Sequence, residues 1–323
     1  MQKFKRHKKV YMGFLDSIQS IISVYLLIAV GYILTKKEIL STEFGSRIAW
    51  LVVNLTFPAY ILSALPYQFT KAQFMESAGG ILVALIATAV LYPIGYLTGR
   101  LFKVKKENMG VFLALFVYSN VVFIGLPVNQ ALFGDSSVAY VLEYYIANTI
   151  LFWTLGVYSL QKSSGSGKGG INLKALLTPS LTATVVAIIF VLVGFKLPEM
   201  LQKPASMLGS MTSPLATLFI GMVFAEMKLS DFKITKDFWA VMIGRFIASP
   251  AAVLLIMMFF TSFNADRQEV YILQAAMPAM NQVTILSKYY GCDYKYSTIL
   301  TVWSFVVSMI ALPLYVTSFH YLF

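Results

Sequence analysis

Two uncharged segments of the sequence each carry a proline followed by side-chain amides, and these residues could bind a small solute. The first segment contains residues 126–130 (LPVNQ), with Pro127, and the second contains residues 277–282 (MPAMNQ), with Pro278. A proline costs the interior of a helix about 3 kcal/mol, because it removes a hydrogen bond and clashes with the preceding turn. Matching breaks in the two halves of a chain indicate the substrate site of an inverted-repeat transporter.

The elements that carry these residues are predicted to be membrane helices. Of the 323 residues, 58% are hydrophobic and 12% are charged, and the mean hydropathy is +0.74, which is far more apolar than a soluble domain. The uncharged stretches have about the 20 residues that a helix needs to cross about 30 Å of hydrocarbon. They lack the short alternating segments of a membrane barrel. The ten predicted spans are 17–34, 48–66, 77–99, 110–133, 138–160, 176–195, 205–225, 238–260, 270–287 and 297–319.

The distribution of Lys and Arg predicts the orientation of these spans. The loops after the odd-numbered spans carry fifteen Lys or Arg, whereas the opposite side carries nine, five of them in the first ten residues. Because basic residues collect in cytoplasmic loops, both termini are expected outside the plasma membrane of the cell. The basic tail runs against this orientation, and Met12 is an alternative native start that would remove residues 1–11.

A hydrophilic stretch, residues 161–174, divides the predicted spans into five and five. An odd number of crossings inverts the second copy, so the two halves predict an inverted repeat, with weak string matches in the same order in both. The expected organisation is an N-terminal tail 1–16, a first five-helix repeat 17–160, a cytoplasmic linker 161–174 and a second five-helix repeat 175–323.

Strings in several spans resemble those of the auxin efflux carrier family of bacteria and plants, from about Leu15 over nearly the whole chain. What the resemblance implies is an all-α integral membrane fold of ten transmembrane helices in a 5+5 inverted repeat, similar to bile-acid sodium symporters. The implied scaffold and transport domains are each built from both repeats, and broken crossover helices 4 and 9 cross at their prolines. The strings are 119–127 (SNVVFIGLP), 131–134 (ALFG), 274–278 (QAAMP), 289–293 (YYGCD), 54–58 (NLTFP), 178–180 (TPS) and 311–314 (ALPL).

Members of this family move organic anions such as auxin or small dicarboxylates. The chain is therefore interpreted as a secondary transporter that exports or exchanges small carboxylates by alternating access, and not as an enzyme. An anion channel or a transporter-like membrane sensor is the alternative. The expected partners are the organic anion and the lipid bilayer, without nucleic acid, and a homodimer is left open.

The groups expected to hold the anion are neutral, because no Lys or Arg is expected near mid-membrane. A half-helix N-terminus carries about half a positive charge, and its free N–H groups can bind a carboxylate. The resemblance carries a substrate-contacting role to Asn120 and Asn148, and Asn129 and Gln130 are weaker candidates. An interhelical hydrogen bond of about 1 kcal/mol is the alternative role of each amide. The predicted substrate site comprises Asn120, Pro127, Asn148, Pro278, Asn281 and Gln282.

Formal charge is scarce inside the predicted spans. Arg245 is interpreted as reaching along its helix to the cytoplasmic face, with attraction of an anion into the inner vestibule as the alternative. Glu143, near the outer end of the fifth span, is the candidate for carrying a coupling proton. Na⁺ or the membrane potential alone could drive transport instead. No cofactor or metal site is expected, since Cys292 has no His or Cys neighbours.

The orientation gives a first prediction. A cysteine introduced at Ser164, in a chain whose Cys292 is replaced by serine, should be unreactive toward an impermeant thiol reagent in intact cells. The reason is that the 161–174 loop faces the cytoplasm. Labelling of permeabilised cells is the positive control, and ready labelling of intact cells would reverse the orientation.

Overall fold

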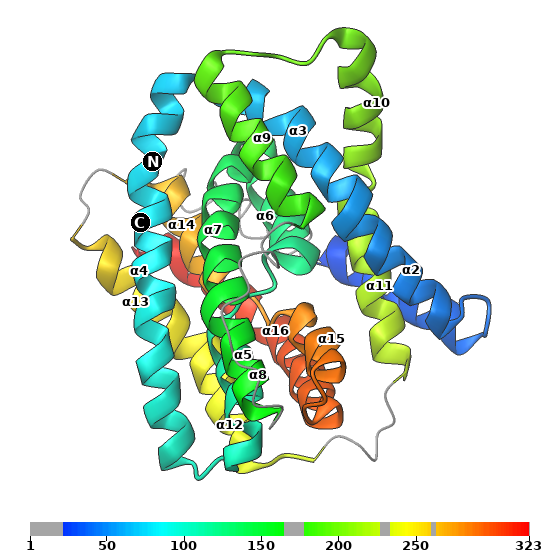
Figure 1. The fold of residues 1–323 in the computed structure, drawn as a ribbon, viewed down its shortest axis with the longest axis vertical. Helices are drawn as coiled ribbons and strands as arrows, with labels where there is room; N and C mark the ends of the chain where they lie inside the picture. The colour runs from blue at the N-terminus through cyan, green and yellow to red at the C-terminus, as the bar shows by residue number, and fades with distance from the viewer. Residues whose placement is uncertain (1–21, 165–177, 227–232, 260–262, 323) are drawn as a thin grey trace, which may run out of the picture.

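The computed structural model describes residues 22–164, 178–226, 233–259 and 263–322, which form helices and short connections (Figure 1). The predicted tail 1–16 and most of the predicted linker 161–174 lie outside the described residues. Within the described ranges, the pairing that resembles a strand contact is one isolated antiparallel bridge between Ser119 and Ala279. The predicted all-helical class is confirmed for these ranges.

Helices lie at every predicted span, and several of them are interrupted. The first half contains the helix Ile22–Lys36, α2 (Thr42–Leu51), α3 (Phe57–Gln68), α4 (Lys71–Leu101), α5 (Met109–Val117), α6 (Leu126–Phe133), α7 (Val138–Leu151) and α8 (Val157–Ser163). The second half contains α9 (Pro179–Val193), α10 (Glu199–Ser210), α11 (Thr212–Glu226), α12 (Lys236–Ile243), α13 (Ser249–Met257), α14 (Ala265–Ala275), α15 (Asn281–Tyr289) and α16 (Tyr294–Leu322).

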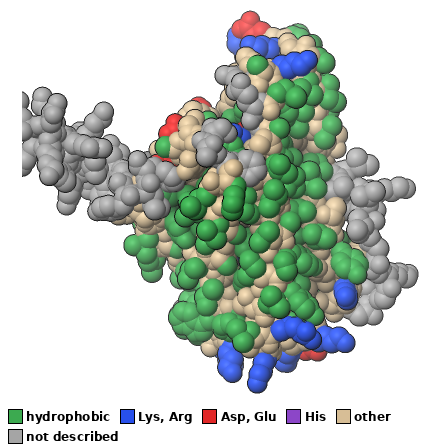
Figure 2. Space-filling model, turned by 90° about the vertical axis from the view of Figure 1, so that its left-hand side faces the viewer, with side chains coloured by type: hydrophobic (Ala, Val, Ile, Leu, Met, Phe, Trp, Pro, Cys, Tyr) green, Lys and Arg blue, Asp and Glu red, His purple; other side chains and the backbone are tan. Residues whose placement is uncertain are grey.

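The surface of the helices is apolar, as a bilayer requires. Within the described residues, six helical stretches are long and apolar enough to cross a membrane, and others are shorter apolar helices. Figure 2 shows hydrophobic side chains covering the middle of the molecule, with Lys and Arg gathered at its upper and lower ends. Exposed Leu97, Ile247 and Leu314 belong to this apolar surface. The chain is a multi-pass membrane protein.

Local chemistry sets where individual helices begin and end. Thr178 caps α9 by accepting a hydrogen bond from the Leu181 N–H at 3.2 Å, and Pro179 follows in the first turn, where its missing N–H is harmless. The helix ends at Gly194, whose φ of 71° lies in the left-handed region that glycine adopts without strain. These signals make α9 a short helix with a defined start and stop.

The helices form two packed groups that face one another. In one group, α3 packs against α9 and α10, and α11 packs against α2. In the other, α4 packs against α5, α7 and α13, and α16 packs against α12 and α15. Figure 1 shows α2, α3, α10 and α11 together on the right and α4, α7 and α12 on the left. The candidate site lies at the boundary between these groups.

Two helices are broken, and they cross at their breaks. Between α5 and α6 the helix stops at residues 118–120, and between α14 and α15 it stops at residues 276–280. The Asn120 N–H donates to the Pro278 carbonyl at 2.9 Å, and the Met280 N–H donates to the Tyr118 carbonyl at 3.1 Å. The two breaks therefore satisfy part of each other's backbone, as they must where lipid offers no partner.

The prediction that Pro127 breaks its helix is wrong, whereas Pro278 does lie in the second break. Pro127 sits in the first turn of α6, directly after a π-turn at Val121–Gly125. The wider turn and the helix start accommodate a residue that has no N–H to donate. Pro58 and Pro250 also follow π-turns, at Val52–Thr56 and Gly244–Ala248.

Arg245 binds the backbone carbonyl groups that the two helix breaks leave without helical partners. It is completely buried, and its guanidinium donates to the Phe116 carbonyl at 3.2 Å and to the Val117 carbonyl at 2.8 Å, where α5 ends. It also donates to the Ala275 carbonyl at 2.7 Å and to the Met277 carbonyl at 2.9 and 3.1 Å, where α14 ends. One side chain thus joins the C-terminal ends of both broken helices.

The interpretation of Arg245 as a residue that reaches the cytoplasmic face is therefore wrong. Each half-helix C-terminus carries about half a negative charge, so two of them offset the single positive charge of a guanidinium. The planar group presents its N–H donors in a fixed fork, which fits carbonyls converging from two chain segments. These hydrogen bonds inside the protein therefore stabilise the guanidinium more than water at the helix end would.

Replacing Arg245 with glutamine should destabilise the protein, because several buried carbonyls would lose their donor. We expect a loss of at least about 3 kcal/mol, measured as a lower thermal unfolding midpoint in detergent. The unfolding midpoint of Arg245→Lys should lie between those of the unchanged protein and of Arg245→Gln, since an ammonium group cannot reproduce the forked donor geometry of a guanidinium. Arg47→Gln is the control, because its contact with Glu43 is exposed and should count for little. Equal midpoints for the Arg245 and Arg47 variants would contradict this role.

Candidate functional site

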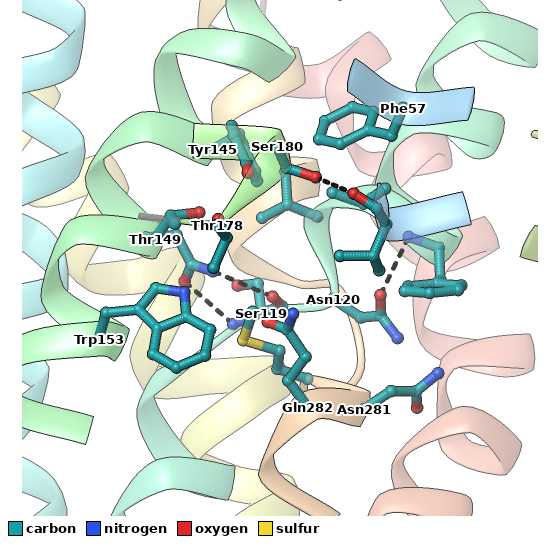
Figure 3. Close-up of a pocket in the computed structure, with 16 residues that line it drawn as sticks. Phe57, Ser119, Asn120, Tyr145, Thr149, Trp153, Thr178, Ser180, Asn281 and Gln282 are labelled. Atoms are coloured by element: carbon teal, nitrogen blue, oxygen red, sulfur yellow. Dashed lines mark hydrogen bonds between the residues drawn. The ribbon is translucent and has the colours of Figure 1, made fainter. Parts of the chain in front are cut away.

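A cavity lies where the two broken helices cross, on the side that faces the other helix group (Figure 3). It contains about 500 Å³ of space not filled by protein atoms, its mouth included. The crossing contributes Ser119, Asn120 and Asn281, while Phe57 of α3 and Ser180 of α9 line the opposite wall. The cavity is thus built from both helix groups.

Two asparagines with unpartnered amide donors, one from each break, line this cavity. The Asn120 side chain accepts a hydrogen bond from the Phe123 N–H at 3.1 Å through its Oδ1, which fixes its orientation. Its Nδ2 is buried and has no hydrogen-bond partner in the described chain, and the same holds for Nδ2 of Asn281. Leaving a buried donor unsatisfied costs about 1–3 kcal/mol. An acceptor in the cavity, from a ligand or water, would remove this cost.

The N-terminal ends of two half-helices add positive potential to these donors. The helical segment after the first break begins at Val121, and α15 begins at Asn281. Met280 precedes α15 and supplies no side-chain cap to its first turn. Val121 and Gln282 both line the cavity. Both half-helices therefore direct their N-terminal ends, each with about half a positive charge, at the same space.

Asn148 bonds to the backbone of the first break. It lines the cavity, yet its Oδ1 accepts from the Ser119 N–H and its Nδ2 donates to the Ser119 carbonyl, both at 3.2 Å. Because these two bonds fit one residue's backbone in both directions, they replace the helix bonds lost at the break. In this structure Asn148 holds the break in position.

The remaining predicted residues divide between the cavity and its surroundings. Gln282 lines the cavity, and Pro278 contributes its carbonyl to Asn120 without lining it. Pro127 is also outside the lining. Asn129 donates to the Gly125 carbonyl at 2.7 Å, and Gln130 donates to the Tyr60 hydroxyl at 3.0 Å. Gln130 thus makes the interhelical hydrogen bond that was its alternative role, whereas the Asn129 bond lies within its own helix.

A positive charge lies directly behind the cavity, contrary to the expectation of a purely neutral site. Arg245 donates to the Ser119 hydroxyl at 2.6 Å, and Ser119 lines the cavity. The guanidinium itself is enclosed by carbonyl groups and does not line the cavity. It sets the position of Ser119 and contributes its field to the site from within the protein.

The sequence analysis missed an aromatic and hydroxyl face of the cavity. Tyr145, Thr149 and Trp153 line it together with Asn148 and Thr178. Positions 145, 148 and 149 recur at helical spacing, so they lie on one face of α7. A step of three residues back from Asn148 reaches Tyr145, and steps of four from Tyr145 reach Thr149 and Trp153, so this helical periodicity would have identified them.

Glu143 belongs to a separate buried ion pair. Its Oε2 accepts from the Arg267 guanidinium at 2.7 and 3.1 Å and from the Tyr271 hydroxyl at 2.7 Å. Gly80 of α4 faces this cluster, and an added Cβ there would collide with all three side chains. Glu143 does not line the cavity. The expectation of a carboxylate at the cavity edge therefore has no geometric support.

The described residues contain no group of three or more His, Cys, Asp or Glu side chains that could hold a metal ion. Cys292 instead donates to the Leu160 carbonyl at 3.3 Å. The chemistry available at the cavity is therefore hydrogen bonding and electrostatic attraction.

Comparison with known proteins gives consistent matches over most of the chain. A family model described as "Membrane transport protein" matches residues 16–170 and 168–316. The chain is 26% identical over 301 residues to an uncharacterized transporter of Methanocaldococcus jannaschii, which covers 90% of this chain and 96% of the relative. It is 24% identical over 281 residues to the uncharacterized transporter YfdV of Escherichia coli, covering 84% of this chain and 88% of the relative.

The Glu143 ion pair leads to a prediction that separates a structural role from proton transfer. Glu143→Gln should lower stability by about 3–5 kcal/mol, because it leaves the buried Arg267 cation without its counter-charge. The double variant with Arg267→Gln should regain part of this loss, measured as a coupling between thermal unfolding midpoints. Glu199→Gln, in an exposed pair with Lys203, is the control. An unchanged midpoint for Glu143→Gln, together with loss of pH dependence in transport, would instead favour proton carriage.

Proposed function

Because the chain belongs to the auxin efflux carrier family of membrane transport proteins, we propose that it is a secondary transporter of small organic anions. The transported species would be carboxylates, exported or exchanged across the plasma membrane by alternating access. The observation that carries this proposal is the cavity at the crossing, where two half-helix N-termini and the unpartnered amide donors of Asn120 and Asn281 converge.

The donor set favours an anion over a cation or a neutral solute. Nδ2 of Asn120 and Nδ2 of Asn281 can donate but not accept, and the N-terminal ends of the half-helices attract negative charge. A carboxylate has two acceptor oxygens that suit such donors. Phe57, Tyr145 and Trp153 add apolar walls, which favour a carboxylate that carries an apolar body.

The position of the cavity supports alternating access. Its walls come from the crossing on one side and from α3 and α9 on the other, so movement of one helix group against the other would open it toward either face. The Arg245 bonds tie α5, α12–α13 and α14 into one unit. We infer that this unit moves as a rigid transport domain against a scaffold that includes α3 and α9.

We further propose that the fold is a ten-span inverted repeat, with repeats 17–160 and 175–323. Two features support it: the antiparallel bridge that relates the two breaks, and the family match in two segments that meet near residue 170. The proposed orientation has both termini outside and the 161–174 loop in the cytoplasm. Since Glu143 is paired with Arg267, the drives best supported are the membrane potential and Na⁺.

The substrate class can be tested on the purified protein. Indole-3-acetate, malate and succinate should be compared for thermal stabilisation, since a ligand at 100 times its dissociation constant adds about 2.7 kcal/mol. In liposomes, the most stabilising carboxylate should show saturable counterflow. Single-channel currents without counterflow would instead indicate a channel, and binding without any flux would indicate a sensor.

Asn120 should carry much of the affinity for that carboxylate. Asn120→Ala removes a hydrogen bond to a charged group and should weaken binding by about 1.5–3 kcal/mol, or roughly 10–150-fold. Calorimetry on purified variants is the measurement. Asn54→Ala is the control, because Asn54 bonds to the Trp50 carbonyl and does not line the cavity. Binding by Asn120→Ala as tight as by Asn54→Ala would place the anion elsewhere.

A further inference from the structure

A second cavity, unrelated to the crossing, lies between the end of α4, the start of α5 and α8. It contains about 1350 Å³, its open mouth included, and shares no lining residue with the first cavity. Its polar lining consists mainly of basic and tyrosine side chains. They are Arg100, Lys103, Lys106, Lys162, Tyr92, Tyr96 and Tyr158.

The charge of this groove is strongly one-sided. No Asp or Glu among the described residues lines it, and the neighbouring Glu107 lies 3.8 Å from Lys105, which is outside the lining. Arg100 lies over the ring of Tyr96, 5.5 Å from its centre. Four cations that line one concave surface favour an anionic occupant with several acceptor oxygens.

The groove is held in shape by local backbone structure. Lys103 adopts a left-handed conformation, with φ of 58°, and the Val104 N–H donates to the Gly99 carbonyl at 2.9 Å. This tight turn keeps Arg100 and Lys103 next to the start of α5. The Gly110 N–H donates to the Ser163 hydroxyl at 2.7 Å, which fixes α8 against α5. The basic side chains therefore project from a defined frame.

An apolar stripe leads directly to the groove. Leu82, Ile86, Pro93 and Leu97 are exposed on α4, and their spacing of four, seven and four residues places them along the face of the helix that Arg100 continues. The last of them, Leu97, is 66% exposed and lies one helical turn before Arg100. Figure 2 shows an apolar belt above Lys and Arg side chains at the lower end of the molecule. The groove therefore lies where hydrocarbon meets headgroups.

We propose that this groove binds the headgroup of an anionic phospholipid, whose acyl chains lie along the α4 stripe. The Arg100 guanidinium and the lysine ammonium groups bind phosphate oxygens, and tyrosines are favoured at the membrane interface, where their hydroxyls can also donate. Basic pockets between helices suit such lipids. The stripe selects a lipid over a soluble anion, because a soluble anion would leave it unused.

The test uses the purified full chain and compares thermal stabilisation by phosphatidylglycerol, by phosphatidylcholine and by inorganic phosphate. Phosphatidylglycerol should stabilise the protein most, and the effect should decrease with added salt. The variant Lys103→Asn, Lys106→Gln, Lys162→Gln removes three charges, with asparagine chosen because it tolerates a positive φ. Its affinity for phosphatidylglycerol should fall roughly 100-fold, at about fivefold per lysine.

The control variant Lys37→Gln, Lys233→Gln, Lys236→Gln removes the same charge from exposed positions outside the groove and should change the affinity less than about twofold. Lys162→Gln alone, expected to weaken binding about fivefold, serves if the triple variant does not fold. Equal weakening in both triple variants would overturn the proposal in favour of diffuse charge. Stabilisation by inorganic phosphate equal to that by the lipid would also overturn it. Carboxylate binding at Asn120 should be unchanged, which separates this test from that of the transport site.

Discussion

One buried guanidinium holds together the part of the molecule on which everything else depends. A membrane helix can break only where the protein itself satisfies the freed backbone groups, and here two helices break at the same place. Arg245 takes up carbonyls at the ends of α5 and α14, while the two breaks bond to each other through Asn120 and Met280. The polar ends of the helices are thereby sorted, with carbonyls facing Arg245 and N–H groups facing the cavity.

This sorting decides the electrostatics of the site. Two half-helix C-termini offset the charge of Arg245, so the cavity is dominated by the opposite ends of the same helices. Asn148 keeps Ser119 extended between them. The proposed anion site and the crossing consequently share residues, and a substitution that alters the stability of the crossing will often alter the cavity. The basic groove beside α4 does not share them, since its residues project from helix ends and a turn.

The sequence was informative wherever a signal is local. The lengths of the hydrophobic stretches located the spans. Pro278 and the amides after it predicted one break, and two of the residues proposed from it, Asn281 and Gln282, line the cavity. Long-range partners could not be predicted in this way. Arg245 looked like a residue near a helix end because its carbonyl partners lie 30 to 129 positions away, and Arg267, 124 positions from Glu143, looked like part of a loop. Pro127 misled because a proline inside an apolar segment does not say whether the helix breaks or widens.

The π-turn before Pro127 has a consequence for how this chain tolerates change. Such a turn holds one more residue than an α-helical turn, so the side chains of α6 are rotated about the helix axis by roughly 100° relative to their positions after an α-helical first turn. Deleting a single residue from Val121–Gly125 would therefore re-aim every side chain of α6 without shortening the span appreciably. Pairwise alignment across this segment should accordingly be judged by the register of Asn120 and Pro127 separately, since one gap between them changes the geometry more than several substitutions would.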